Sequence, residues 1–233
     1  MKQFSIIILA VLITALLVNI NFFKTLYLIA RVSPPYEQTG SGDKTLLILG
    51  DSTGYGTGAS RRTESVAGLI GAAYPELSII NQSENGRTAK KLRRDIQKLE
   101  GKYDTILLQI GANDLLRHTP PAEVVVEIEG IAVDLRKHTD RVLVLTSGNI
   151  GAAPRFNVTK KAAYTDSFRI YDQLMQSQAM KTGSFRFVSQ FNEPEDDPFV
   201  LEAEKNFSMD GLHPSSDGYA LWFKELKQHL KEI

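Results

Sequence analysis

The chain has 233 residues, 42% hydrophobic and 23% charged, a composition typical of a globular protein that argues against a disordered chain. Its 27 basic and 27 acidic residues balance, so no global positive field favours nucleic acid as a partner. Cysteine is absent, which excludes disulfides, thiolate zinc sites and a cysteine nucleophile.

The first predicted element is an apolar run, Phe4–Phe23, which lies between Lys2 and Lys24. A helix of about 20 residues spans the hydrocarbon core of a bilayer, so residues 1–32 are predicted to form a transmembrane anchor. A cleaved secretory signal is the main alternative, and a soluble role is a third. The charges on the two flanks are nearly balanced. The orientation is therefore predicted from the position of the run, which is that of a signal segment. We expect the domain to face the extracytoplasmic side, anchored to the membrane, or to be secreted if the segment is cleaved.

Residues 33–43 are rich in proline, glycine and serine and are predicted to be a linker, followed by one domain over residues 44–233. In this domain short apolar runs of strand character alternate with helical patterns. The expected strands cover residues 46–49, 77–80, 105–110, 142–146 and 185–188. The expected helices cover residues 64–74, 89–100, 121–138, 160–181 and 215–231.

This alternation predicts an α/β fold with a five-stranded parallel sheet covered by helices on both faces, a three-layer α/β/α sandwich of the flavodoxin-like type. Ligands of such sheets bind beyond the carboxyl ends of the strands. Functional residues are therefore expected directly after strands.

The segment Gly50–Gly56 follows the first strand and places Ser52 at an exposed strand-to-helix turn. A glycine-rich turn at this position could instead cradle a phosphate. However, the chain has neither the dinucleotide-binding glycine fingerprint nor a Walker sequence here. A flavodoxin-like nucleotide binder is therefore disfavoured.

Three further segments follow the same rule. Gly86 lies in the segment after the second strand, and Asn113 lies in a Gly-Ala-Asn-Asp segment after the third. Near the C-terminus, the segment Asp210–Pro214 contains His213. Each fragment alone is as compatible with a turn as with a site, but their order and their position at strand ends make the set specific.

The four segments resemble the blocks of the SGNH/GDSL hydrolase family, named for a serine, a glycine, an asparagine and a histidine. Here these are Ser52, Gly86, Asn113 and His213, and the resemblance covers about residues 44–232. One departure is Thr53, where the GDSL form has leucine, and it leaves the catalytic groups untouched.

The resemblance implies that Ser52 is the nucleophile, His213 its general base and Asp210 the acid that orients the imidazole. It also implies an oxyanion hole made by the backbone N–H groups of Ser52 and Gly86 and the side-chain amide of Asn113. No metal ion or other cofactor is expected. The acidic cluster at residues 193–197 lacks the spacing of a calcium loop and is expected to be a solvated loop.

The expected function is therefore an esterase that acts by acyl transfer to Ser52 and then to water. Two classes of small-molecule substrate compete: the acyl group of a lipid, lysophospholipid or thioester, and an O-acetyl group on a carbohydrate. A non-catalytic binding protein that kept the fold is the alternative. Five aromatic residues either line an acyl pocket or pack in the core: Phe156, Tyr164, Phe168, Phe191 and Phe199.

Overall fold

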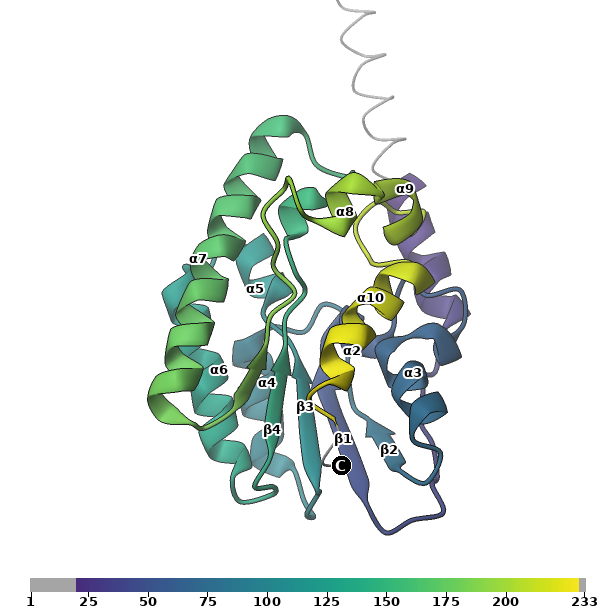
Figure 1. The fold of residues 1–233 in the computed structure, drawn as a ribbon, viewed down its shortest axis with the longest axis vertical. Helices are drawn as coiled ribbons and strands as arrows, with labels where there is room; N and C mark the ends of the chain where they lie inside the picture. Colours follow the sequence, from purple (N-terminus) through teal and green to yellow (C-terminus); the bar gives the residue numbers. More distant parts are fainter. Residues whose placement is uncertain (1–19, 231–233) are drawn as a thin grey trace, which may run out of the picture.

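The computed structural model describes residues 20–230 and confirms a five-stranded, wholly parallel sheet (Figure 1). The strand order across the sheet is β2-β1-β3-β4-β5. The strands are β1 (Thr45–Gly50), β2 (Ser78–Asn81), β3 (Thr105–Gln109), β4 (Val142–Leu145) and β5 (Arg186–Val188).

Helices cover both faces of the sheet, as the predicted sandwich requires (Figure 1). One face carries α4 (Ala89–Asp95), α6 (Pro121–Leu135) and α7 (Val158–Thr182), and the other carries α3 (Val66–Ala73) and α10 (Ser216–Lys227). Shorter helices lie in the connections: α2 (Ser52–Tyr55), α5 (Ala112–Leu116), α8 (Pro198–Leu201) and α9 (Ala203–Asn206). Three turns are 3-10 helices: η1 (Arg62–Glu64), η2 (Ile96–Lys98) and η3 (Ile150–Ala152).

The alternation of side chains along β1 supplies two cores. Leu47 and Leu49 pack with α4, α6 and α7, while Leu46 and Ile48 pack with α3 and α10. All four side chains are at most 2% exposed. A strand buried on both faces reads in sequence as a continuous apolar run, which is why the strands could be recognised from their composition.

The predicted helices agree with the observed ones, and local capping explains where they begin. Asn157 and Ser215 each accept a hydrogen bond from a backbone N–H in the first turn of α7 and α10. Pro121 occupies the first turn of α6. The sequence did not reveal α2 or α5, because helices of four or five residues are too short to carry a hydrophobic period.

The strand order reverses between β1 and β3. Chain connections therefore leave these two neighbouring strands in opposite directions, which opens a crevice at their carboxyl ends. The segment that contains Ser52 follows β1, and the segment that contains Asn113 follows β3. The fold thus brings two of the sequence-predicted site segments to the same crevice.

Most of the apolar run Phe4–Phe23 lies outside the described residues, so the anchor and the division at residue 33 stay predictions. Within residues 20–230, no helix has both the length and the apolar character needed to cross a bilayer. Residues 20–31 are helical and pack on the domain, where Leu28 is fully buried. The predicted linker also contacts the domain, because Gln38 pairs with Ile79 of β2.

The turn between β1 and α2 is held by Asp51. Its Oδ1 accepts hydrogen bonds from the backbone N and the hydroxyl of Thr53, at 2.9 and 2.8 Å. The other carboxylate oxygen is buried without a hydrogen-bond partner. Burial raises the pKa of the Asp51 carboxyl to about 6, although the bonds from Thr53 and the charge of His213 act in the opposite direction.

This pKa makes stability depend on pH. The folded-state pKa of Asp51 lies above its unfolded value, so the folded protein favours the protonated carboxyl. The contribution of Asp51 to the unfolding free energy is therefore fully present below about pH 4 and is lost as the pH rises through 6. We expect the unfolding free energy of the wild type, relative to Asp51→Asn, to fall by roughly 2–3 kcal/mol between pH 4 and pH 7. Urea unfolding at several pH values measures this difference. Asp43→Asn, at an exposed position, controls for the loss of one charge, and parallel curves for wild type and Asp51→Asn would contradict the prediction.

Candidate active site

Ser52 occupies the first position of α2, directly after β1. The backbone N–H at this helix position has no acceptor within the helix and is free to bind an external oxygen. The turn is packed tightly, since a Cβ on Gly54 would clash with the hydroxyl oxygen of Ser83. Two features of the sequence Gly-Asp-Ser-Thr-Gly therefore hold Ser52 in place. Asp51 caps the helix that begins at Ser52, and Gly54 lets this helix pack against the segment that follows β2.

A continuous hydrogen-bonded chain leads from Ser52 into the protein. Ser52 Oγ lies 3.0 Å from His213 Nε2, and His213 Nδ1 lies 2.7 Å from Asp210 Oδ2. His213 is 8% exposed and Asp210 is 2% exposed, so water has little access to these two residues. The structure thus brings together three residues that the sequence separates by up to 161 positions.

Electrostatics fix the direction of these bonds. Burial alone would raise the pKa of Asp210, but its bond to His213, the charge of His213 and two backbone N–H groups together hold the pKa well below its usual range. The carboxylate is therefore ionised and can only accept, so His213 Nδ1 donates to it. In the neutral imidazole the remaining nitrogen, Nε2, is an acceptor aimed at the Ser52 hydroxyl. This arrangement can take a proton from Ser52.

Asn113 reaches the same region from the segment after β3. Gly111 has a φ of 111°, and a Cβ at this position would lie 2.9 Å from Tyr171 Oη, so glycine allows α5 to begin directly after the strand. One N–H of the Asn113 amide donates to the carbonyl of Arg87 at 3.2 Å. An amide nitrogen carries two hydrogens, so the second is available to a substrate oxygen.

Gly86 is exposed and has a φ of 76°, a conformation that favours glycine. Its carbonyl accepts a hydrogen bond from Arg117 at 3.1 Å, and its neighbour Arg87 contacts Asn113. Gly86 does not line the cavity beside Ser52 that is described next. The structure thus places Gly86 on the loop next to Asn113 rather than on the wall of that cavity.

A small cavity of about 50 Å³ lies beside Ser52 and is also lined by Asn113 and His213. The loop after β4 closes one side of it with residues 147–150. Large apolar side chains form much of the remaining wall: Leu116, Ile150, Phe199, Phe207, Leu212 and Trp222. The cavity therefore combines a few polar groups, those of Ser52, Asn113 and His213 among them, with a largely apolar wall, as sites for small organic molecules do.

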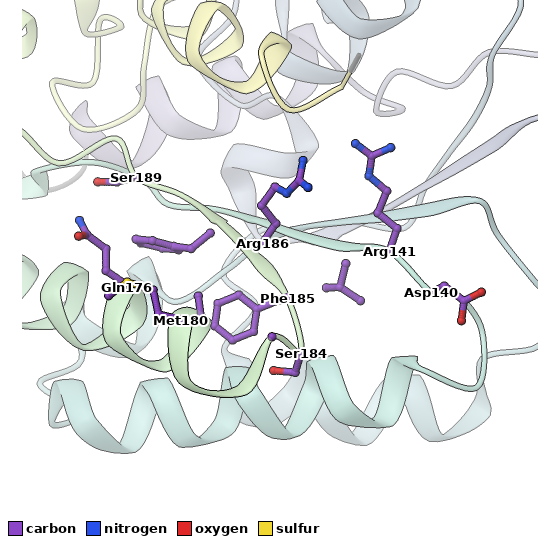
Figure 2. Close-up of a pocket in the computed structure, with 12 residues that line it drawn as sticks. Asp140, Arg141, Gln176, Met180, Ser184, Phe185, Arg186 and Ser189 are labelled. Atoms are coloured by element: carbon purple, nitrogen blue, oxygen red, sulfur yellow. The ribbon is translucent and has the colours of Figure 1, made fainter. Parts of the chain in front are cut away.

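A larger cavity, of about 770 Å³, lies between β4, β5 and the C-terminal part of α7 (Figure 2). Arg141 and Arg186, near the amino ends of β4 and β5, line it together with the last turns of α7. It contains none of the site residues predicted from the sequence. Because parallel sheets bind ligands at the carboxyl ends of their strands, the smaller cavity beside Ser52 is the candidate active site.

The sequence did not indicate every residue near the site. The loop after β4 carried no motif, and Phe207 was not among the candidate pocket aromatics. Of those candidates, Phe199 lines the cavity, whereas Phe168 is 1% exposed within the core on the α7 side. Thr25 was also missed: its hydroxyl donates to Asp210 Oδ2 at 3.0 Å from the helix at residues 20–31. No local pattern signals a contact across 185 positions.

Solved structures share this fold at low sequence identity. A member of the lipolytic G-D-S-L family from Veillonella parvula is 14% identical with a TM-score of 0.65, covering 82% of this chain and all of the other. The psychrotrophic esterase EstA from Pseudoalteromonas is 20% identical with a TM-score of 0.54, covering 82% and 98%. The acetylxylan esterase Axe2 from Geobacillus stearothermophilus is 17% identical with a TM-score of 0.57, covering 83% and 97%. These likenesses show the fold.

Among curated proteins, none matches this sequence significantly. The model of the GDSL-like lipase/acylhydrolase family matches residues 48–221, which include the segments of Ser52, Gly86, Asn113 and His213. The match covers most of the chain and agrees with the resemblance inferred from the sequence. The chain therefore belongs to the GDSL-like lipase/acylhydrolase family and is an ester-hydrolysing enzyme of the SGNH type.

Proposed function

We propose that Ser52, His213 and Asp210 form the catalytic triad of this esterase. The observation that carries the proposal is the unbroken chain of hydrogen bonds, 3.0 Å from Ser52 Oγ to His213 Nε2 and 2.7 Å from His213 Nδ1 to Asp210 Oδ2. A serine hydroxyl is a weak nucleophile until a base removes its proton, and Nε2 is within reach to do so. Asp210 stabilises the imidazolium that results and holds the ring in its working tautomer.

The reaction then follows from proton transfers at named atoms. Ser52 Oγ attacks the ester carbonyl while its proton moves to His213 Nε2, which gives a tetrahedral intermediate. The imidazolium returns this proton to the oxygen of the leaving alcohol, and the acyl group remains on Ser52. Water, deprotonated by the same nitrogen, attacks the acyl-enzyme and releases the carboxylic acid and the free serine.

The oxyanion of the intermediate needs donors aimed at it. We assign this role to the backbone N–H groups of Ser52 and Gly86 and to the Asn113 amide. The position of Ser52 at the start of α2 and the second, unused hydrogen of the Asn113 amide support the assignment. For Gly86 the assignment rests on its family block, because this residue does not line the cavity.

The size of the cavity favours a short acyl group. A site needs roughly 10–15 Å³ for each water-sized group, so the cavity of about 50 Å³ holds about three to five such groups. An acetyl group has three heavy atoms and fits, whereas a long lipid acyl chain does not. The substrate class that we propose is therefore a small acyl ester, such as an O-acetyl group on a carbohydrate, rather than a long-chain lipid or thioester.

The proposed location is the extracytoplasmic face of a membrane, with residues 1–32 as the attachment. The apolar run of the sequence supports this location, and several exposed apolar side chains on the helix at residues 20–31 continue it: Phe22, Phe23, Leu26 and Tyr27. Cleavage of the segment as a signal would give a secreted enzyme with the same site.

The triad predicts that Ser52→Ala lowers ester hydrolysis by at least about 10⁴-fold, with an unchanged melting temperature. His213→Ala is expected to be nearly as damaging, and the double variant little worse, since the two residues act as a unit. Hydrolysis of p-nitrophenyl acetate and labelling by a fluorophosphonate measure the effect. Turnover at the wild-type rate in folded Ser52→Ala would refute the assignment.

Asn113→Ala is expected to lower kcat on the order of a hundredfold, with a much smaller change in KM. An oxyanion donor acts mainly in the transition state, which explains the split. Steady-state kinetics with p-nitrophenyl acetate provide the measurement. An effect confined to KM would instead assign Asn113 to substrate binding.

The small cavity predicts a strong preference for short acyl chains. We expect kcat/KM for p-nitrophenyl acetate to exceed that for the octanoate ester by at least about tenfold, a difference of about 1.4 kcal/mol. Leu116→Ala, which enlarges the wall of the cavity, should raise the relative rate with butyrate. Wild-type activity that rises steadily toward palmitate would rule out the small acyl pocket.

A further inference from the structure

The carboxylate of Asp210 is held by two groups of donors. Its Oδ1 accepts from Ser208 Oγ at 2.9 Å and from the backbone N–H groups of Leu212 and His213, each at 3.0 Å. These donors belong to the same turn as Asp210 and move with it. At Oδ2, His213 Nδ1 donates at 2.7 Å. Among the described residues, one further donor comes from far outside this turn: Thr25 Oγ1 lies 3.0 Å from Asp210 Oδ2.

The Thr25 hydroxyl has one hydrogen and two acceptors within reach. Its oxygen lies 3.0 Å from the carbonyl of Asn21, one helical turn earlier, and 3.0 Å from Asp210 Oδ2. The low pKa of Asp210 keeps that carboxylate ionised, and charge-assisted hydrogen bonds are about twice as strong as neutral ones. The hydrogen therefore points to Asp210.

The bond from Thr25 gives Asp210 Oδ2 its second hydrogen-bond donor. A carboxylate oxygen has about two lone-pair sites, and Oδ2 uses one for His213 Nδ1 and the other for Thr25. The two donors together fix the plane of the carboxylate about its Cβ–Cγ bond. Without Thr25, this plane is set only by donors that move with the turn, and the angle at which Oδ2 meets His213 is held less tightly.

Two other contacts show that the helix at residues 20–31 is seated on the catalytic segments. Arg31 donates to the carbonyls of Gly58 and Ala59, at 2.8 to 3.1 Å. Gly58 packs so closely on the turn of His213 that a Cβ there would lie 2.9 Å from His213 Cβ. Just beyond the helix, Ser33 accepts a hydrogen bond from Tyr55 at the end of α2. The position of Thr25 is therefore defined by neighbours of both Ser52 and His213.

We propose that Thr25 is a positioning residue of the active site: from the N-terminal helix it holds Asp210 in the orientation that aligns His213. The proposal rests on the triad assigned above. It makes the helix before residue 33 part of the catalytic apparatus and not only an attachment. A change in how this helix is seated then alters the rate of the chemical step.

The test compares Thr25→Val with Thr182→Val in the full-length protein. Thr182 is a matched control because it also lies on a helix, bonds a carbonyl one turn earlier and contacts a carboxylate, that of Glu129. We expect Thr25→Val to lower kcat for p-nitrophenyl acetate about tenfold with KM changed less than about twofold, since orientation affects the chemical step. Thr182→Val should stay within about twofold of the wild type.

A conservative variant distinguishes a positioning role of the Thr25 hydroxyl from a purely structural role of the side chain. Thr25→Ser keeps the hydroxyl and should recover most of the lost kcat, and the rate of fluorophosphonate labelling should follow the same order. Thr25→Ala carries the same expectation as Thr25→Val if the valine variant does not fold. A kcat for Thr25→Val equal to that for Thr182→Val, or a Thr25→Ser variant as slow as Thr25→Val, would overturn the proposal.

Ser52→Ala, measured in parallel, distinguishes the two levels of failure. If Ser52→Ala still turns over at the wild-type rate, the triad itself is wrong. If Ser52→Ala is inactive while Thr25→Val is unaffected, the triad stands and only the role of Thr25 is refuted.

Discussion

The hydrogen bond between the buried carboxylate of Asp210 and the imidazole of His213 is the interaction on which the site depends. A carboxylate that is 2% exposed loses most of its hydration, so its charge must be compensated by donors within the protein. The turn provides three of these at Oδ1, and His213 and Thr25 provide two at Oδ2. This compensation keeps Asp210 ionised, and an ionised Asp210 leaves His213 Nε2 as the acceptor that faces Ser52.

Two carboxylates near the nucleophile have opposite environments. Asp210 accepts five hydrogen bonds and its pKa is lowered, whereas one oxygen of Asp51 has no partner and burial raises its pKa to about 6. The difference separates their roles. Asp210 is equipped to stabilise a cation on His213, and Asp51 caps the helix that presents Ser52.

The sheet topology determines where the site lies, and the side chains around the crevice determine the volume of its cavity. Reversal of the strand order at β1 and β3 opens the crevice that Ser52 and Asn113 share. Side chains from α8, the loop after β4 and the turn before α10 line this crevice, and the cavity between them has about 50 Å³. Related folds can thus keep the same catalytic groups and differ in substrate through the side chains that fill the crevice.

The sequence by itself determined the five strands, the long helices and the segments of Ser52, Asn113 and His213. These depend on local patterns: apolar runs, capping residues, and polar residues directly after strands. Only the tertiary structure decided that Thr25 meets Asp210, that the predicted linker pairs with β2 through Gln38, and that the cavity is small. Such features depend on how elements distant in the chain pack together, and packing is set by the shapes of side chains in three dimensions, which no periodicity in the sequence records.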